Sequence, residues 1–176
     1  MKKFDTIQIN TVYQGKVFDV RNDEVRLPNG KTTMLDIVAH PPAVVIVPLD
    51  NEGNIWFVRQ YRHAADQIML ELPAGVIDPG EQPDICAQRE LREEVGMSAN
   101  QIQKIGEFYI APGYSSEFLH IFLASGLQPD PLPGDEDEFI SVERIPTELA
   151  FSMVEDGKIQ DSKTLASLLL AYPHLK

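Results

Sequence analysis

Three glutamates in one short segment are the residues of this sequence best suited to chemistry. Glu90 and Glu94 stand four positions apart, with Glu93 beside them. The segment Pro83–Val95 predicts a helix, because it starts with a proline, contains no glycine and is followed by Gly96. Carboxylates one helical turn apart repel each other on an ordinary solvated face, which is the alternative interpretation. A hard divalent cation would turn that repulsion into coordination, because it prefers oxygen ligands and shares them with substrate phosphates.

The residues around this helix are those needed to hold it in place. Ala87, Leu91 and Val95 recur at every fourth position and predict a buried stripe beside the glutamates. The segment Glu71–Gly75 ends a predicted strand, and Asp78–Glu81 forms a tight loop before the helix. The order is therefore strand, loop and helix, with a further carboxylate in the loop.

This segment resembles the complete Nudix box. The motif runs from Gly75 through Glu81 to the continuous stretch Arg89–Met97, and every fixed position is filled. The resemblance implies the Nudix fold, an α/β/α sandwich with a mixed sheet. It also implies hydrolysis of a nucleoside diphosphate that is linked to another group, with Mg²⁺ as the cofactor or Mn²⁺ in its place.

The same resemblance assigns a role to each matching residue. It implies that Glu90 and Glu94 are the principal metal ligands and that Glu93 is a second-tier ligand among the catalytic residues. The carbonyl of Ala74, just before the motif glycine, would be a backbone ligand. Glu81 and Arg89 would brace the loop against the helix.

Segments outside the box resemble the ADP-ribose pyrophosphatase branch of the family. Val58–Arg62 is followed nine residues later by Glu71–Gly75, and the loop Ala111–Glu117 is similar to the specificity loop of that branch. The substrate contacts implied are Arg62 as a bidentate clamp on the pyrophosphate, Pro112 and Glu117 in the loop, and Phe18 or Tyr13 stacking on the base. A surface salt bridge for Arg62 and a core position for the aromatic residue are the structural alternatives.

The acidic segment Gly134–Glu138 occupies the place where this branch carries its catalytic base. We expect Glu136 to be the base that activates water, and Glu138 to be a further metal ligand or the alternative base. A solvated acidic loop is the other interpretation, since the sequence does not tell which glutamate points inward.

The hydrophobic pattern predicts a mixed α/β architecture in two parts. Residues 1–40 form an N-terminal antiparallel β-meander, for which the resemblance implies roles in dimerisation and base binding. Residues 41–176 form the hydrolase domain. Strands are expected at 17–25, 32–38, 43–49, 55–58, 105–110, 118–124 and 139–142, and further helices at 146–155 and 162–172.

Charge and cysteine content limit the partners and the compartment. The 176 residues carry a formal net charge of −12, which repels nucleic acid, although a metal could still bridge carboxylates to a small nucleotide. The sequence has no apolar run long enough to span a membrane and no signal-like segment, so we expect neither membrane contact nor secretion. The single Cys86 suits a reducing compartment, and we expect the cytoplasm.

The reaction expected is metal-assisted hydrolysis of ADP-ribose to AMP and ribose 5-phosphate. Another nucleoside diphosphate sugar, such as GDP-mannose or UDP-glucose, is the alternative, because base and sugar contacts lie outside the box. A non-catalytic nucleotide sensor is less consistent with the three retained glutamates. An acidic Ca²⁺-binding protein is disfavoured because no EF-hand spacing occurs in the sequence.

Overall fold

The computed structural model describes residues 2–134 and 139–175, and these residues form two structural units. One unit contains Met1–Pro42 together with Phe108–Phe118, and the other contains Ala43–Glu107 together with Leu119–Lys176. Among the described residues, no helix is long and apolar enough to cross a membrane.

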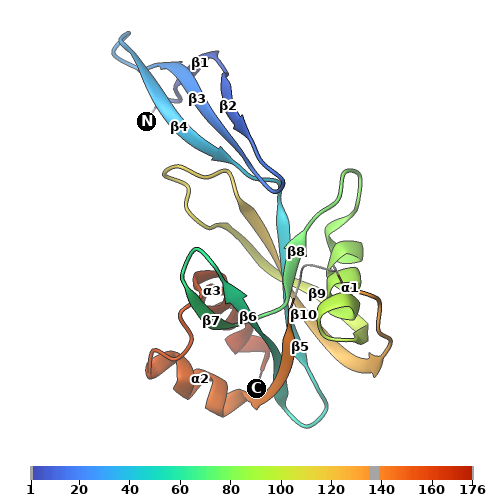
Figure 1. Ribbon diagram of the computed structural model, residues 1–176. Coiled ribbons are helices and arrows are strands. Elements are labelled where there is room, and N and C mark those ends of the chain that lie inside the picture. The colour runs from blue at the N-terminus through green and yellow to red at the C-terminus, as the bar shows by residue number, and fades with distance from the viewer. Residues whose placement is uncertain (1, 135–138, 176) are drawn as a thin grey trace. The chain divides into compact units, whose positions relative to one another are not determined.

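The first unit contains an antiparallel sheet centred on β3 (Figure 1). Its strands are β1 (Asp5–Gln8), β2 (Thr11–Gln14), β3 (Asp19–Arg26) and β4 (Thr32–Ala39). β3 pairs with β4 along one edge over its whole length, while β1 and β2 pair in turn with the two halves of its other edge. The segment Phe108–Phe118 of this unit is tied to the end of β4. The Val38 N–H donates to the Tyr114 carbonyl, and the Ser116 N–H donates to the Val38 carbonyl.

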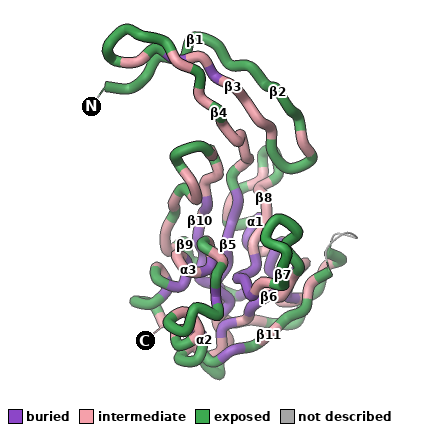
Figure 2. Tube along the Cα trace, turned by 60° about the vertical axis from the view of Figure 1, so that its left-hand side comes forward, coloured by how far each residue is buried: buried purple, intermediate pink, exposed green. Residues whose placement is uncertain are grey.

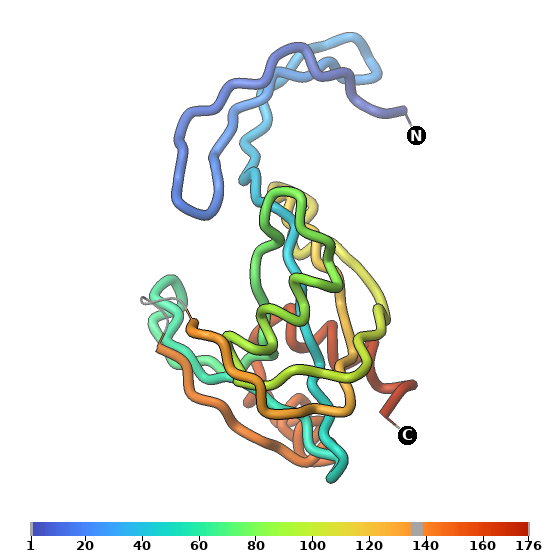
Figure 3. The backbone as a smooth tube through the Cα atoms, turned by 90° about the vertical axis from the view of Figure 1, so that its right-hand side faces the viewer, coloured from blue at the N-terminus to red at the C-terminus, as the bar shows by residue number. Residues whose placement is uncertain are grey.

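The second unit is built on a mixed sheet in the order β11, β6, β5, β10 and β9, with β7 paired to β6 and β8 paired to β5. The strands are β5 (Ala43–Leu49), β6 (Asn54–Arg62), β7 (Gln67–Glu71), β8 (Ala74–Val76), β9 (Met97–Tyr109), β10 (Phe118–Pro129) and β11 (Ser141–Pro146). β5 and β10 are parallel, whereas β11 is antiparallel to β6 and runs alongside it in Figure 3.

Helices cover both faces of this sheet. They are α1 (Pro83–Glu94), α2 (Thr147–Glu155) and α3 (Ser162–Ala171), followed by the 3-10 turn η1 (Tyr172–His174). α1 and α3 both contact β5, one from each side (Figure 1). A strand that is covered on both faces needs apolar residues at successive positions, and β5 is accordingly buried along nearly its whole length (Figure 2).

The apolar stripe expected on α1 is the part of the helix that enters the core. Ala87, Leu91 and Val95 are buried and pack with Val44 and Ile46 of β5. Pro83 begins the helix, where its missing N–H has no intrahelical partner to lose. Gly96 follows the helix with φ of 75°, a left-handed conformation that favours glycine.

The expected α/β/α architecture is confirmed, and most differences from the sequence prediction concern element boundaries. The last strand occupies Ser141–Pro146 rather than 139–142, and the strand expected to begin at 105 begins at Met97. The short strands β1 and β2 were not expected, because all of their residues are exposed and give no burial pattern. The final helix ends at Ala171, one residue earlier than predicted.

Candidate active site

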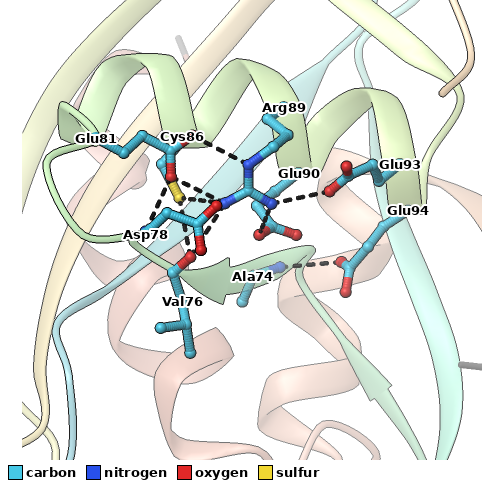
Figure 4. Close-up of polar contacts among 9 residues, drawn as sticks. All are labelled: Ala74, Val76, Asp78, Glu81, Cys86, Arg89, Glu90, Glu93 and Glu94. Carbon is cyan, nitrogen blue, oxygen red and sulfur yellow. Dashed lines mark hydrogen bonds and ion pairs between the residues drawn. The ribbon is translucent and has the colours of Figure 1, made fainter. Parts of the chain in front are cut away.

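The guanidinium of Arg89 lies at the centre of a set of carboxylates on and before α1, all within the second unit (Figure 4). Its Nε and Nη2 donate to the two carboxylate oxygens of Glu81, each at 3.0 Å. Nη2 also donates to the Val76 carbonyl at 3.1 Å, which ties the helix to the end of β8. Arg89 and Glu81 thus connect the loop to the helix, in the positions expected of a brace.

Two glutamates of the motif bind the remaining edge of the same guanidinium. Nη1 of Arg89 donates to Glu90 Oε1 at 2.6 Å and to Glu93 Oε2 at 2.9 Å. The hydrogen bond from Arg89 lowers the pKa of Glu81 to about 2, so that carboxylate stays charged at neutral pH. We call Glu81, Arg89, Glu90, Glu93 and Glu94 the carboxylate cluster.

Gly75 provides the space in which the Glu90 side chain lies. A Cβ placed on Gly75 would overlap the Glu90 carboxylate, so glycine at this position leaves room for that carboxylate beside β8. The sequence motif contains this glycine, but its spacing does not reveal which side chain needs the space.

Glu94 faces the same strand from the next turn of the helix. Its Oε2 accepts the backbone N–H of Ala74 at 3.0 Å (Figure 4). Both Glu90 and Glu94 are buried. A buried carboxylate is costly unless it is hydrogen-bonded or bound to a cation, and these two lie on the side of α1 that faces β8.

The donors in the carboxylate cluster fit a hard divalent cation. They are carboxylate oxygens, and three carboxylates pair with a single guanidinium while Glu94 lies on the same helix, so the cluster carries excess negative charge. No cage of three or more acidic, histidine or cysteine side chains that could hold a metal ion is present among the described residues. Mg²⁺ needs no such cage, because it retains several waters and binds through one or two carboxylates together with substrate phosphates.

Arg62 at the end of β6 forms a second polar cluster with residues from β7 and α3. Its Nε and Nη2 donate to the two oxygens of Glu71 at 2.8 Å and 2.7 Å. Lys163 also donates to Glu71, and it donates to Asp161 at 2.8 Å. We call Arg62, Glu71, Asp161 and Lys163 the balanced cluster, since it holds two cations and two anions.

The balanced cluster is electrostatically connected to α1 through Glu94. Burial by itself raises the pKa of Glu71, but the Arg62 hydrogen bond and the Lys163 charge outweigh it and lower that pKa. The hydrogen bond to Glu71 raises the pKa of Arg62, and the charges of Asp161 and Glu94 contribute in the same direction. Arg62 is therefore close enough to Glu94 for their charges to interact.

Three of the expected substrate contacts belong to the first unit. Phe18 is 41% exposed, Pro112 is exposed, and Glu117 is partly buried, with its carbonyl accepting the Ile110 N–H. The structure thus places Phe18 and the loop with Pro112 in one unit, and their contacts with substrate stay predictions. Glu136 and Glu138 lie outside the described residues, so their roles stay predictions as well.

Sequence reasoning did not identify Asp161 and Lys163. A weak local signal exists for Asp161, which caps α3 by accepting the Thr164 N–H at 3.0 Å. No local signal exists for Lys163, because its partner Glu71 lies 92 residues earlier. Cys86 is buried in α1, and burial raises the pKa of its thiol, so it is no candidate nucleophile.

The chain belongs to the Nudix family, as its fold and carboxylate helix indicate. Residues 39–168 match the NUDIX domain. The family is generally dependent on divalent metals, which agrees with the chemistry of the carboxylate cluster.

Individual relatives cover nearly the whole chain. The ADP-ribose pyrophosphatase of Bacillus subtilis (strain 168) is 40% identical over 161 residues, covering 90% of this chain and 87% of that protein. The methanol dehydrogenase activator of Bacillus methanolicus is 36% identical and covers 93% and 89%. A crystal structure of an ADP compounds hydrolase superposes with a TM-score of 0.89 at 29% identity, covering 99% of this chain and 95% of the other.

Proposed function

We propose that this protein hydrolyses the pyrophosphate bond of ADP-ribose, giving AMP and ribose 5-phosphate, with Mg²⁺ as the metal and Mn²⁺ as a substitute. The observation that carries the proposal is the carboxylate cluster, in which Glu90 and Glu94 are buried against β8. The choice of an ADP-containing substrate is supported by the names of the B. subtilis relative and of the structural neighbour.

The residues divide the work of hydrolysis between two sides of the site. Glu90 and Glu94 would hold the divalent cation, with Glu93 and the Ala74 carbonyl as further ligands. A bound cation neutralises charge on the pyrophosphate oxygens and lowers the pKa of a bound water. Arg62 would bind a phosphate and orient the substrate.

The proton of the attacking water goes to Glu136, with Glu138 as the alternative base or a further ligand. Water attacks one phosphorus, the bridging P–O bond breaks, and the other phosphate leaves. Arg89 lies between Glu90 and Glu93 and would keep both carboxylates oriented while the substrate exchanges.

Apolar side chains exposed on the first unit support a homodimer formed through the β-meander. A monomer rarely exposes a large group of apolar residues without a partner. The exposed residues of this kind are Phe4, Ile7, Ile9, Val12, Tyr13, Val17, Phe18 and Met34. Light scattering should show a dimer, and a fully active monomer would contradict this part of the proposal.

A cytoplasmic location is proposed on the basis of the free, buried Cys86.

The test measures the hydrolysis of a panel of substrates by the purified protein with Mg²⁺. The amount of monophosphate released is the readout. The panel contains ADP-ribose, GDP-mannose, UDP-glucose, NADH, diadenosine polyphosphates and nucleoside triphosphates. Preferred ADP-ribose turnover that disappears with EDTA is the expected result. Preference for another sugar keeps the chemistry and changes the substrate, whereas no turnover of any compound favours a nucleotide sensor.

A further inference from the structure

The first turn of α3 brings a lysine from a distant part of the chain next to Glu71, the partner of Arg62. Lys163 donates to both Glu71 and Asp161, and its side chain is 14% exposed. Glu71 is almost completely buried, with 1% of its side chain exposed. A cation in this position is not needed for solubility, since most of its side chain is covered.

Glu71 in turn determines how the Arg62 guanidinium is oriented. The two hydrogen bonds between them involve Nε and Nη2 on one edge of the guanidinium and both carboxylate oxygens. Such a bidentate pair fixes the plane of the group. Arginine has five N–H donors, and within the described residues the others of Arg62 have no bonded partner. The outer edge of this 43% exposed side chain is therefore available to an anion.

Lys163 balances the charges that act on Arg62. Without it, the buried Glu71 and the neighbouring Asp161 would present two negative charges to Arg62 alone. The guanidinium would then be held more strongly by its own protein and would be oriented less well toward a phosphate. Because Lys163 neutralises one of the two charges, Arg62 is fixed by Glu71 without being neutralised by Asp161 as well.

The backbone around Lys163 is also held by hydrogen bonds that do not involve the Lys163 side chain. The Leu72 N–H donates to Thr164 Oγ1 at 2.9 Å, and Thr164 Oγ1 donates to Asp161 Oδ2 at 2.6 Å. Thr164 is fully buried. Removal of the Lys163 charge therefore leaves the attachment of α3 to the end of β7 in place, which makes the charge testable by substitution.

We propose that Lys163 is a positioning residue for pyrophosphate binding: it holds Glu71 so that Arg62 presents its outer N–H groups to the substrate phosphates. This inference rests on the proposed function, since Arg62 is taken there as the phosphate-binding residue.

The test compares Lys163→Gln and Lys163→Arg in steady-state hydrolysis of ADP-ribose. Lys163→Gln removes the charge and should raise KM about tenfold, while kcat changes less than about twofold. A tenfold change lies within the interaction energies measured between residues of one ion-pair network. Lys163→Arg keeps the charge and should restore most of the loss. Titration of ADP-ribose into the protein with EDTA, where no turnover occurs, should show the same loss of affinity.

A double-mutant cycle with Arg62→Ala separates positioning from general stability. If Lys163 acts through Arg62, Lys163→Gln should raise KM in the native background and have little effect in the Arg62→Ala background. An equal effect in both backgrounds, or an unchanged KM in the single variant, would overturn the proposal. Melting curves should show that each variant is folded.

Lys158→Gln is the matched control. Lys158 pairs with Asp156 at 2.9 Å with the same two-residue spacing as Lys163 and Asp161, but the side chains of Lys158 and Asp156 are both largely exposed. It should leave KM unchanged. If the native protein fails to hydrolyse ADP-ribose, the proposed function fails first, and the cycle is run with the panel compound that is hydrolysed. Absence of any turnover overturns the proposed function alone, and the ADP-ribose titrations with EDTA then test Lys163: unchanged affinity in Lys163→Gln overturns the present proposal.

Discussion

The carboxylate cluster and the balanced cluster lie in the same unit, and they use charge in opposite ways. In the carboxylate cluster, Arg89 binds Glu81, Glu90 and Glu93, with Glu94 on the next turn. In the balanced cluster, two cations and two anions pair with one another. The first carries excess negative charge, whereas the charges of the second are balanced.

This difference shows which role each cluster can have. Arg89 offsets only part of the negative charge, and a bound metal would offset more of it, so the carboxylate cluster is suited to recruiting a cofactor. A neutral network gains little from a metal and instead holds its members rigidly. The balanced cluster is thus suited to fixing Arg62. The predictions below test this division of roles.

The largest effect is expected from Glu94→Gln. The amide oxygen can still accept the Ala74 N–H, but the negative charge that a metal needs is lost. We expect kcat to fall roughly 10³-fold, because metal assistance is worth several kcal/mol in the transition state. Circular dichroism should show an intact fold. Asp84→Asn, an exposed change on the same helix, is the control; full activity of folded Glu94→Gln would remove Glu94 from the metal site.

Gly75→Ala should be the next most harmful change. The added methyl group would overlap the Glu90 carboxylate and force it away from β8. We expect kcat to fall about 100-fold, because a small misplacement of a site residue can cost this much, and Mg²⁺ affinity measured by calorimetry should fall with it. Glu90→Asp in the same chain shortens the side chain and should restore part of the Mg²⁺ affinity. No restoration would mean that the overlap is not the cause.

Glu71→Gln should lower stability, in contrast to Glu94→Gln. It removes the charge that holds both Arg62 and Lys163, and we expect the free energy of unfolding in urea to fall by about 2 kcal/mol, since Arg62 is partly exposed. Glu94→Gln measured with EDTA should change stability by less than about 0.5 kcal/mol, because it relieves repulsion with Glu90. Equal losses in both variants would contradict the division into two kinds of cluster.

The smallest effect concerns acid stability. The pKa of Glu81 is lowered from 4.5 to about 2, so its contribution is full above pH 4.5 and is lost as the pH falls from about 4.5 toward 2. With allowance for solvent screening, the contribution is about 1 kcal/mol. Urea unfolding at pH 6 and pH 3 should show a smaller acid loss for Glu81→Gln than for the native chain. An identical loss would show that the Arg89 pair does not stabilise the fold.

The same two clusters show what the sequence can predict. Glu90 and Glu94 lie on one helix, and helical spacing places them near each other. Glu81 lies before that helix, and its pairing with Arg89 was expected from the family resemblance. The apolar stripe of α1 and the buried strand β5 were predicted for a similar reason, because their periodicity is local. The α/β/α fold follows from those elements and from the family motif.

The rest depends on contacts between distant segments. The pairing of Glu71 with Lys163 across 92 residues leaves no local pattern. Arg62 was interpreted as a phosphate clamp, and the sequence did not show that one of its edges is occupied by Glu71. The inclusion of Phe108–Phe118 in the unit of the β-meander also had no local signal.

The hydrogen bond from Leu72 to Thr164 has a consequence for the order in which the site forms during synthesis. Helix α1 and Arg62 leave the ribosome well before Asp161, Lys163 and Thr164, which lie about 90 residues after Glu71. A nascent chain can therefore build the acidic helix and pair Arg62 with Glu71 while Glu71 still lacks its second partner, Lys163. Competence to bind substrate should appear only when α3 has emerged and docked.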